Sequence, residues 1–452
     1  MLEARALNLT LDFCLRVGEL LLSSGAGAAD VTATMHALAW HLGVRHPDID
    51  VTFTSLSMSY QVSPEEPAVF HARHVKQRDI DYEDLTHVDH LVRDVVADRV
   101  DLAEARSRLA RIVSSGHSTP RWAVTLGWGV MCAGVGLLLG GTAAVIAIAF
   151  AAAVCIDRLQ LLMQRRRMPI FYQQVAGGGV ATLLAVAAAA SGVVTNPSLV
   201  VTANIIMLLA GVGFMGALQD ALSGFYVTAG ARLTEALLAT SGIIAGVSGG
   251  LTVADVAHVK IDRLDLGSAS WESVTLMAVG SAICAGAFAF ACYAPKRIIA
   301  PIAVIAAVAM LISQSFALQG FGRAWPTAFA AFFVGVISYT VAGRLRVPPL
   351  VVVVSAVVPM LPGLSIYRGL ALMAEGGAAT SQGLLAMITA ASVATALSSG
   401  VILGEYVAQP LRREAQKLES RLAGPRLVGP LRTRTGRTAR RARRPEQAPA
   451  AD

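Results

Sequence analysis

The chain has 452 residues, of which 55% are hydrophobic and only 15% carry a charge. Soluble domains hold about 25% charged residues, so this composition excludes an ordinary soluble protein and indicates an integral membrane protein. The net charge of +7 arises at the C-terminal end, because residues 411–452 hold twelve Lys and Arg against four Asp and Glu.

A charge-rich segment, residues 1–119, precedes the first long apolar run. Leu7, Leu11 and Leu15 recur at helical spacing, which predicts an amphipathic first helix. Alternating apolar and polar residues then predict a strand. We expect a small α/β domain in the cytoplasm, with helices over 7–22, 28–42, 81–97 and 101–114 and strands over 50–62 and 68–76.

Candidate metal or acid–base chemistry is confined to that domain. The candidates are His71, His74, His87, His90, Asp81, Glu83, Asp84 and Asp89. They lack an HExxH arrangement, and the five cysteines show no CxxC spacing. We therefore predict no metal, no cofactor and no catalytic residue. A membrane-anchored hydrolase or sensor, with this cluster as its site, stays as an alternative.

The remainder contains long runs without Asp, Glu, Lys or Arg, and a helix needs about 20 apolar residues to span a membrane. Residues 122–156 and 168–219 each suffice for two spans, with turns near Gly140 and near Pro197. A fifth span covers about 233–254. Five more runs follow at 273–295, 298–322, 324–343, 347–367 and 376–404. The fold class is therefore an α-helical polytopic membrane protein with about ten transmembrane helices.

Lys and Arg in alternate loops set the expected orientation, because basic loops stay in the cytoplasm. The basic set is Arg158, Arg165, Arg166, Arg167, Arg232, Lys296, Arg297, Arg344 and Arg346, together with the C-terminal tail. Both termini are thus expected in the cytoplasm. An odd number of spans in each half, 120–255 and 256–410, makes the two five-helix halves inverted. We expect the Arg-rich tail, 411–452, to be disordered and drawn to anionic lipid rather than to nucleic acid.

Two segments interrupt the apolar spans, and charges or broken helices in a membrane commonly mark function. The first runs from Gly216 to Tyr226 and on to Arg232 and Glu235; the second runs from Pro359 to Arg368. Each lies in or after the fourth span of its half. Inverted repeats with matching broken helices are typical of transporters, which bind substrate at the repeat interface. The expected substrate-binding residues are Asp220, Gly224, Tyr226, Pro359, Pro362, Gly363, Ser365, Tyr367 and Arg368.

Each candidate has a chemical role that fits a zwitterionic amino acid. Asp220 can accept an ammonium group or a proton, and Asp220, Arg232 and Glu235 are the candidates for proton coupling. A helix restarting at Gly363 would offer free N–H groups to a carboxylate, and Arg368 adds a cation. The alternatives are that Asp220, Arg232 and Glu235 pair at the headgroups, and that Arg368 extends to the outer surface.

These motifs resemble the bacterial threonine/serine exporter family over roughly residues 10–410. The resemblance rests on Leu21 to Ala26, on Asp220 to Gly224 with Arg232 and Glu235, and on Pro359 to Gly363 with Tyr367 and Arg368. It implies a multi-pass inner-membrane protein that exports threonine and serine by antiport with protons. Its partners would be a small amino acid, protons and membrane lipid. Export of a dicarboxylate is the alternative, and homo-oligomerisation stays open.

Overall fold

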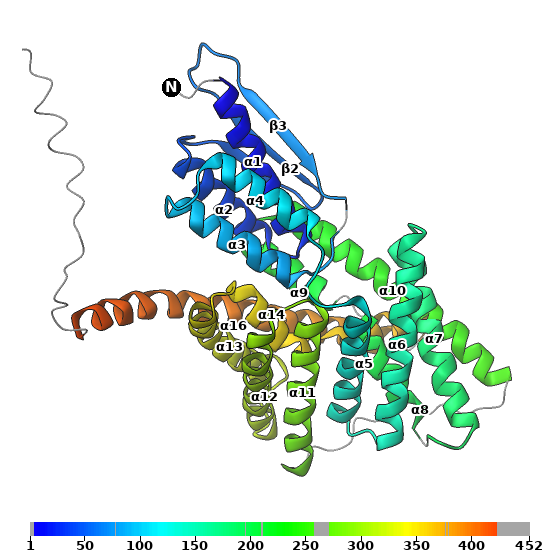
Figure 1. The fold of residues 1–452 in the computed structure, drawn as a ribbon. Helices are drawn as coiled ribbons and strands as arrows, with labels where there is room; N and C mark the ends of the chain where they lie inside the picture. Colours follow the sequence, from blue (N-terminus) through cyan, green and yellow to red (C-terminus); the bar gives the residue numbers. More distant parts are fainter. Residues whose placement is uncertain are drawn as a thin grey trace, which may run out of the picture. The chain divides into compact units, whose positions relative to one another are not determined.

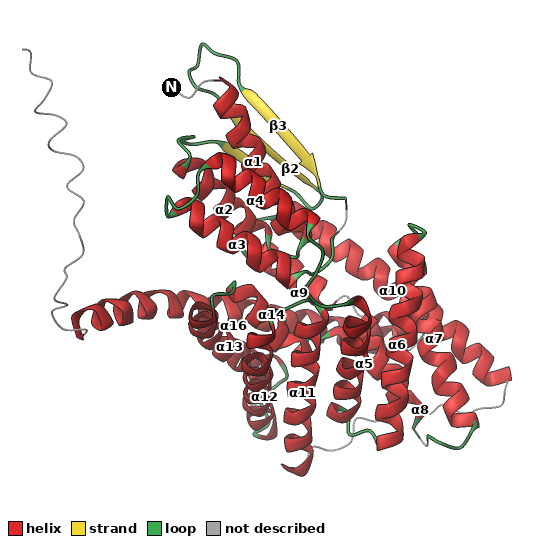
Figure 2. Ribbon diagram, viewed as in Figure 1, coloured by secondary structure: helices red, strands yellow, loops and turns green. Residues whose placement is uncertain are grey.

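The structure, a computed structural model, describes residues 4–422 except 77, 195, 209–210, 257–270, 376 and 378. Residues 257–270, at the junction of the two halves, therefore lie outside the described residues, as does most of the tail. Figures 1 and 2 show a chain that is helical almost throughout, with one small sheet near the N-terminus.

The N-terminal part combines a three-stranded antiparallel sheet with four helices. Its described elements are α1 (Ala4–Ser23), α2 (Ala28–His41), β1 (Asp48–Val51), β2 (Ser55–Tyr60), β3 (Val69–His74), α3 (Tyr82–Val96) and α4 (Leu102–Ser114). Leu11 and Leu15 of α1 are buried together with Leu56 and Met58 of β2. The predicted combination of helices with a small sheet is present in this part of the chain.

One strand prediction was wrong in its extent. The structure divides residues 50–62 into β1 and β2, which pair with Asp48 opposite Ser59. A turn closes this hairpin where the Thr52 N–H donates to the Ser55 carbonyl at 2.8 Å. The turn contains no Gly or Pro, the residues that most often mark turns in a sequence. The predicted partner strand is β3, which pairs with β2.

The spans follow as α5 (Arg121–Leu138), α6 (Ala143–Arg165), α7 (Ile170–Ala190), α8 (Pro197–Leu208), α9 (Gly211–Leu222), α10 (Tyr226–Val256), α11 (Trp271–Ala291), α12 (Lys296–Leu318), α13 (Ala324–Leu345), α14 (Pro349–Val357), α15 (Gly363–Glu375) and α16 (Ala379–Leu422). Among the described residues, eight helices are long and apolar enough to cross a membrane, and ten spans result if each of two bent pairs is one span. The bent pairs are α8 with α9, at 43°, and α14 with α15, at 49°.

The spans lie where the hydropathy pattern predicted them, but α6 extends nine residues beyond the uncharged run that ended at residue 156, and one interruption is displaced. Gly140, with φ +73°, lies in the predicted turn between α5 and α6. The second bend follows a 3-10 turn at Val358–Met360, and α15 restarts at Gly363 as predicted. In the first half the bend precedes Gly211, and α9 continues as a regular helix through Gly216 and Asp220.

Close contact between helices depends on glycine. A Cβ on Gly178 of α7 would lie 2.8 Å from the Ile243 carbonyl oxygen of α10, and one on Gly246 would lie 2.1 Å from the Val175 carbonyl oxygen. Gly335 of α13 and Gly404 of α16 make an equally close approach. Gly177 is packed as closely, with Leu208 of α8, so the small residues of α7 allow its neighbours to approach.

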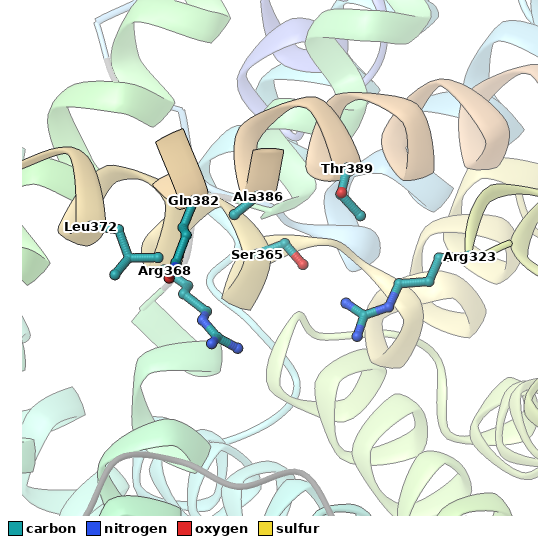
Figure 3. Close-up of a pocket in the computed structure, with 7 residues that line it drawn as sticks. All are labelled: Arg323, Ser365, Arg368, Leu372, Gln382, Ala386 and Thr389. Atoms are coloured by element: carbon teal, nitrogen blue, oxygen red, sulfur yellow. The ribbon is translucent and has the colours of Figure 1, made fainter. Parts of the chain in front are cut away.

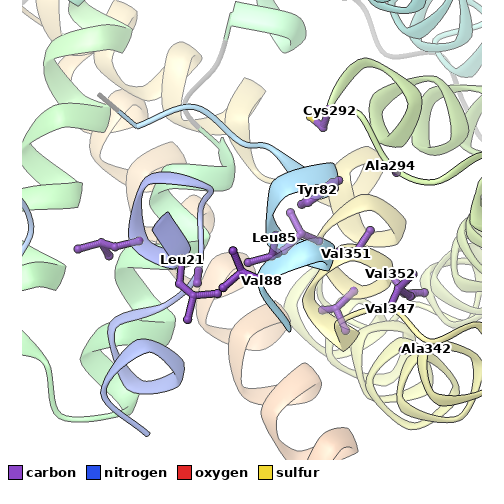
Figure 4. Close-up of a cluster of buried hydrophobic side chains, with 14 of the residues drawn as sticks. Leu21, Tyr82, Leu85, Val88, Cys292, Ala294, Ala342, Val347, Val351 and Val352 are labelled. Atoms are coloured by element: carbon purple, nitrogen blue, oxygen red, sulfur yellow. The ribbon is translucent and has the colours of Figure 1, made fainter. Parts of the chain in front are cut away.

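The N-terminal part is anchored to one end of the spans, which we call the domain face. Tyr82, the first residue of α3, is buried, and its N–H donates to the Cys292 carbonyl at 2.9 Å. Figure 4 shows Tyr82, Leu85 and Val88 among Cys292, Val347 and Val351 of the second half. His90 also bonds the Arg346 carbonyl oxygen at 2.7 Å. The domain is thereby fixed to α11, α13 and α14.

Candidate functional site

A buried ion pair lies at the domain face of the first half. Asp220 of α9 is 2% exposed and Arg232 of α10 is 6% exposed. Arg232 Nε lies 3.1 Å from Asp220 Oδ2, although the two atoms are not aligned for a hydrogen bond. The two helices meet through a tight turn in which Gly224, with φ +90°, reverses the chain. The turn brings residues twelve apart in sequence face to face.

The N-terminal domain completes the surroundings of this pair. The Ala28 N–H donates to Asp220 Oδ1 at 3.0 Å, and Arg232 Nη2 donates to the Ala26 carbonyl oxygen at 3.0 Å. Gly216 leaves room for the guanidinium, since a Cβ there would lie 2.7 Å from Arg232 Nη1. Both charges of the pair are thus bonded to the backbone of the segment 26–28.

Further charged groups surround the pair. Arg78 Nη1 lies 3.8 Å from Glu235 Oε2, and the Arg78 guanidinium carbon lies 4.0 Å from the centre of the Phe53 ring. Burial lowers the pKa of Arg78 to about 10, and nearby Arg232 adds to the decrease. Asp30 retains access to solvent, but the surrounding protein raises its pKa and the Asp220 carboxylate raises it further. Glu405 of α16 is close enough to interact electrostatically with Asp30.

A second polar site lies around the bend of the other half. Ser365 and Arg368 of α15 line a pocket of about 140 Å³ together with Arg323, Gln382 and Thr389. Figure 3 shows Ser365 between the two guanidinium groups in that view. Among the described residues, no carboxylate forms an ion pair with Arg323 or Arg368. The pocket is therefore suited to an anionic group.

The comparisons with known proteins identify the family. Two models described as threonine/serine exporter match residues 12–254 and 277–407. A "Probable threonine/serine exporter" of Mycobacterium tuberculosis is 34% identical over 438 residues, which are 95% of this chain and 82% of the relative. This chain belongs to the threonine/serine exporter family. The "Threonine/serine exporter" of Corynebacterium glutamicum is 32% identical over 407 residues, 88% of this chain and 82% of that protein. No solved structure matches.

In this member of the threonine/serine exporter family, the residues predicted from the sequence divide into two groups. Asp220 and Arg232 lie together, and Glu235 joins them through Arg78. Ser365 and Arg368 lie with Arg323, which follows α12. That helix begins beside Arg346 at the domain face and extends roughly 35 Å over its 23 residues. The pocket therefore lies toward the opposite end of the spans.

The other predicted residues have different surroundings. Tyr226 is 74% exposed, and nothing lies within 4 Å of a Cβ placed on Gly224. Tyr367 packs against the buried apolar cluster of α6, α7 and α8. Pro359 and Pro362 flank the bend before Gly363. The described residues hold no metal-binding group of three or more His, Cys, Asp or Glu. In the N-terminal domain, Asp81 instead caps α3.

Two further polar residues of this family member were not singled out from the sequence. Asn204 of α8 and Ser355 of α14 are fully buried, and each has a side-chain oxygen without a hydrogen-bond partner in the described structure. Each stands a short distance before the bend of its span. The sequence signal for each was a polar side chain within a mostly apolar run, alone in α14 and next but one to Thr202 in α8.

Proposed function

We propose that the protein is a secondary active exporter that moves threonine, serine or similarly small amino acids out of the cytoplasm by proton antiport. Membership of the exporter family supports amino-acid export. The sequence contains no Walker motif for direct use of ATP. A proton gradient is sufficient in energy, since one charge crossing 100 mV provides about 2.3 kcal/mol.

The observation that carries the proposal is the contact between the two bent spans. A Cβ on Gly211, the first residue of α9, would lie 3.2 Å from the Cβ of Leu361, just before α15. Toward the domain face lies the Asp220–Arg232 pair, and toward the opposite end lies the pocket of Ser365 and Arg368. Alternating access would use these two sites in turn, on either side of the contact.

Matching features of the two halves support an inverted repeat. The fourth span of each half is bent, and the third and fifth spans of each half approach through glycine: Gly178 and Gly246 in one, Gly335 and Gly404 in the other. The first spans, α5 and α11, also meet at Gly134 and Gly280. In this proposal the protein lies in a bacterial inner membrane with both termini on the cytoplasmic side. Asp220, Arg232 and Glu235 couple transport to protons.

One observation favours a second candidate substrate. Arg323 and Arg368 line the same pocket, and two cations suit a molecule with two carboxylates. A small dicarboxylate is therefore the alternative cargo. A competition assay distinguishes the two. Labelled threonine and labelled succinate are each measured with the other compound added unlabelled at equal concentration, and only the true cargo should be transported and should reduce the flux of the other.

The test is transport by the purified protein in proteoliposomes. We expect labelled threonine or serine to move with an imposed pH gradient and to stop when an uncoupler removes it. Asp220→Asn and Arg368→Ala should each reduce the initial rate. Asp255→Asn and Arg165→Ala remove similar charges from exposed positions and should leave it unchanged. A rate that ignores the gradient refutes antiport, and full activity of both site variants refutes the site.

A further inference from the structure

The segment 26–28 offers two complementary backbone groups to the Asp220–Arg232 pair. The Ala26 carbonyl accepts from the Arg232 guanidinium, and the Ala28 N–H donates to the Asp220 carboxylate. One residue, Gly27, separates the two groups. Ala26 and Ala28 are buried, at 4% and 0% exposure. The contact is therefore enclosed in protein and bridges positions about 200 residues apart in the chain.

A free α-amino acid carries the same two functions at a closer spacing. Its carboxylate is an acceptor and its ammonium is a donor, and a single carbon joins them, whereas the three backbone atoms of Gly27 lie between the Ala26 carbonyl carbon and the Ala28 nitrogen. A carboxylate binds a guanidinium, and an ammonium binds a carboxylate, through charge-assisted hydrogen bonds that are stronger than bonds to a neutral peptide. We propose that Asp220 and Arg232 form the amino-acid site at the domain face, and that the segment 26–28 occupies it as an internal stand-in for the substrate. This inference rests on the proposed function.

The state of the ion pair supports this reading. Arg232 Nε and Asp220 Oδ2 are buried and lie 3.1 Å apart, yet neither atom has a hydrogen-bond partner in the described structure. Two buried charges need more than each other to offset the loss of water. When the segment leaves, its two hydrogen bonds are lost as well. An arriving amino acid would restore them and pair with both charges, so the two occupants compete.

Competition has a measurable consequence. An internal occupant lowers the apparent affinity for a ligand, because only the unoccupied fraction of the protein can bind it. A substitution that weakens the hydrogen bonds of the segment 26–28 to the ion pair should therefore lower the apparent Kd for the amino acid. If the segment only supported the site, the same change would weaken binding or leave it unaltered.

Ala28→Pro is the sharpest test. Proline lacks the N–H that bonds Asp220, and it is well tolerated at the first position of a helix. Gly27, with φ −71° and ψ 152°, already has the extended conformation that a residue before proline adopts. Ala143→Pro is the matched control, since it stands at the first position of α6 after Thr142, with φ −66° and ψ 166°.

The measurement is equilibrium binding of threonine to the purified full-length protein in detergent. Losing a hydrogen bond to a charged group should tighten the apparent Kd of Ala28→Pro about tenfold, while Ala143→Pro matches the wild type. Unchanged or weaker binding by a folded Ala28→Pro protein overturns the inference. Failure of the proposed function is a separate result: wild-type proteoliposomes would then move neither threonine nor serine.

A second measurement does not depend on the proline. Gly27→Cys in a Cys155→Ala background places a thiol on the segment, where a Cβ would lie 3.6 Å from Asp220 Oδ1, an ordinary contact. Threonine should accelerate its modification by a water-soluble maleimide by displacing the segment. Glycine betaine, which has a carboxylate but no N–H donor, should not. Equal rates with and without threonine overturn the inference.

Discussion

Gly211 lies directly against Leu361, so the two bent spans touch where each changes direction. A Cβ on Gly211 would lie only 3.2 Å from the Leu361 Cβ. The contact joins residues 150 positions apart, one from each half of the membrane region. A transporter that alternates between two states needs contacts that can be remade, and here the Leu361 side chain packs against a glycine that presents no side chain of its own.

The first prediction concerns this contact. Gly211→Val adds three carbon atoms, and the first of them would already lie 3.2 Å from the Leu361 Cβ. Overpacking of this kind costs about 1–3 kcal/mol. We expect the initial transport rate in proteoliposomes to fall about tenfold or more, because the cost falls on the junction between the halves. Gly249→Val in α10 is the control, since nothing lies within 4 Å of a Cβ there. Equal rates for the two variants would show that the junction does not limit transport.

Asp157 is the subject of the second prediction. It lies inside the second span and is 4% exposed. Arg121 Nη2 bonds it at 2.6 Å and Thr125 Oγ1 at 2.7 Å. Asp157→Ala removes the acceptor of Arg121 Nη2, whereas the Thr125 hydroxyl can still donate to the Arg121 carbonyl oxygen at 3.1 Å. The cost is about 1–3 kcal/mol, and it stays moderate because Arg121 retains solvent access. We expect a lower denaturation midpoint in detergent.

The neighbouring residue supplies the control for Asp157. Arg158 is exposed, so Arg158→Ala should leave the midpoint unchanged. Arg158 follows Asp157 in the sequence, but in the structure the partner of Asp157 is Arg121. Destabilisation by Arg158→Ala equal to that by Asp157→Ala would contradict the observed pairing.

The sequence predicted the spans well because the hydrocarbon core imposes a simple rule on them. Charges are excluded over about 20 residues, and this located α5, α7 and α10 to α13. The rule ended the second span at Ile156, whereas α6 continues through Asp157 and Arg158. The second bend was also predictable, since Pro359 and Pro362 cannot donate backbone hydrogen bonds. The first bend has no proline beside it. Gly211 and Gly213 are the only local signal, and glycine is also common in unbroken membrane helices.

The candidate site was predictable in its charges but not in its partners. Asp220 and Arg232 stand out because charges within membrane helices are rare. Their bonds to Ala26 and Ala28 use main-chain atoms, which every residue possesses, so no pattern in the sequence marks them. The pocket at Arg368 was half predicted: Arg323, Gln382 and Thr389 reach it only because α13, α15 and α16 converge there.

The third prediction concerns Tyr82, which anchors the N-terminal domain. Its ring is buried, with the Phe288 ring edge-on at 6.4 Å. Tyr82→Ala removes this contact, and emptying a buried aromatic site costs about 3–5 kcal/mol. Tyr82→Phe keeps the ring, and the lost hydroxyl only faces Ser355 outside hydrogen-bond geometry. We expect Tyr82→Ala to weaken the contact between the N-terminal domain and the domain face. Tyr82→Phe should resemble the wild type.

Limited proteolysis measures that loosening. The exposed segment 115–118 connects the domain to α5, and His117 contacts Asp81 and stacks on Tyr293 at 3.9 Å. Cleavage there should accelerate when α3 leaves the domain face. Tyr82→Ala protein that is cleaved no faster than Tyr82→Phe protein would argue against Tyr82 as the anchor.

The fourth prediction is a pH dependence at Asp30. The surrounding protein and the Asp220 carboxylate raise the pKa of Asp30 although its side chain retains access to solvent, so the folded protein holds this proton more tightly than the unfolded chain, whose Asp pKa is about 3.9. Stability from this group is therefore complete below the unfolded pKa and falls as pH rises through the raised value. Asp30→Asn removes the charge and avoids that loss. The variant should match the wild type near pH 4 and exceed its melting temperature at neutral pH. Asp48→Asn, an exposed acid of the same domain, should show no such pH-dependent difference. If Asp30→Asn is less stable than the wild type at neutral pH, the Asp30 carboxylate stabilises the domain face instead of straining it.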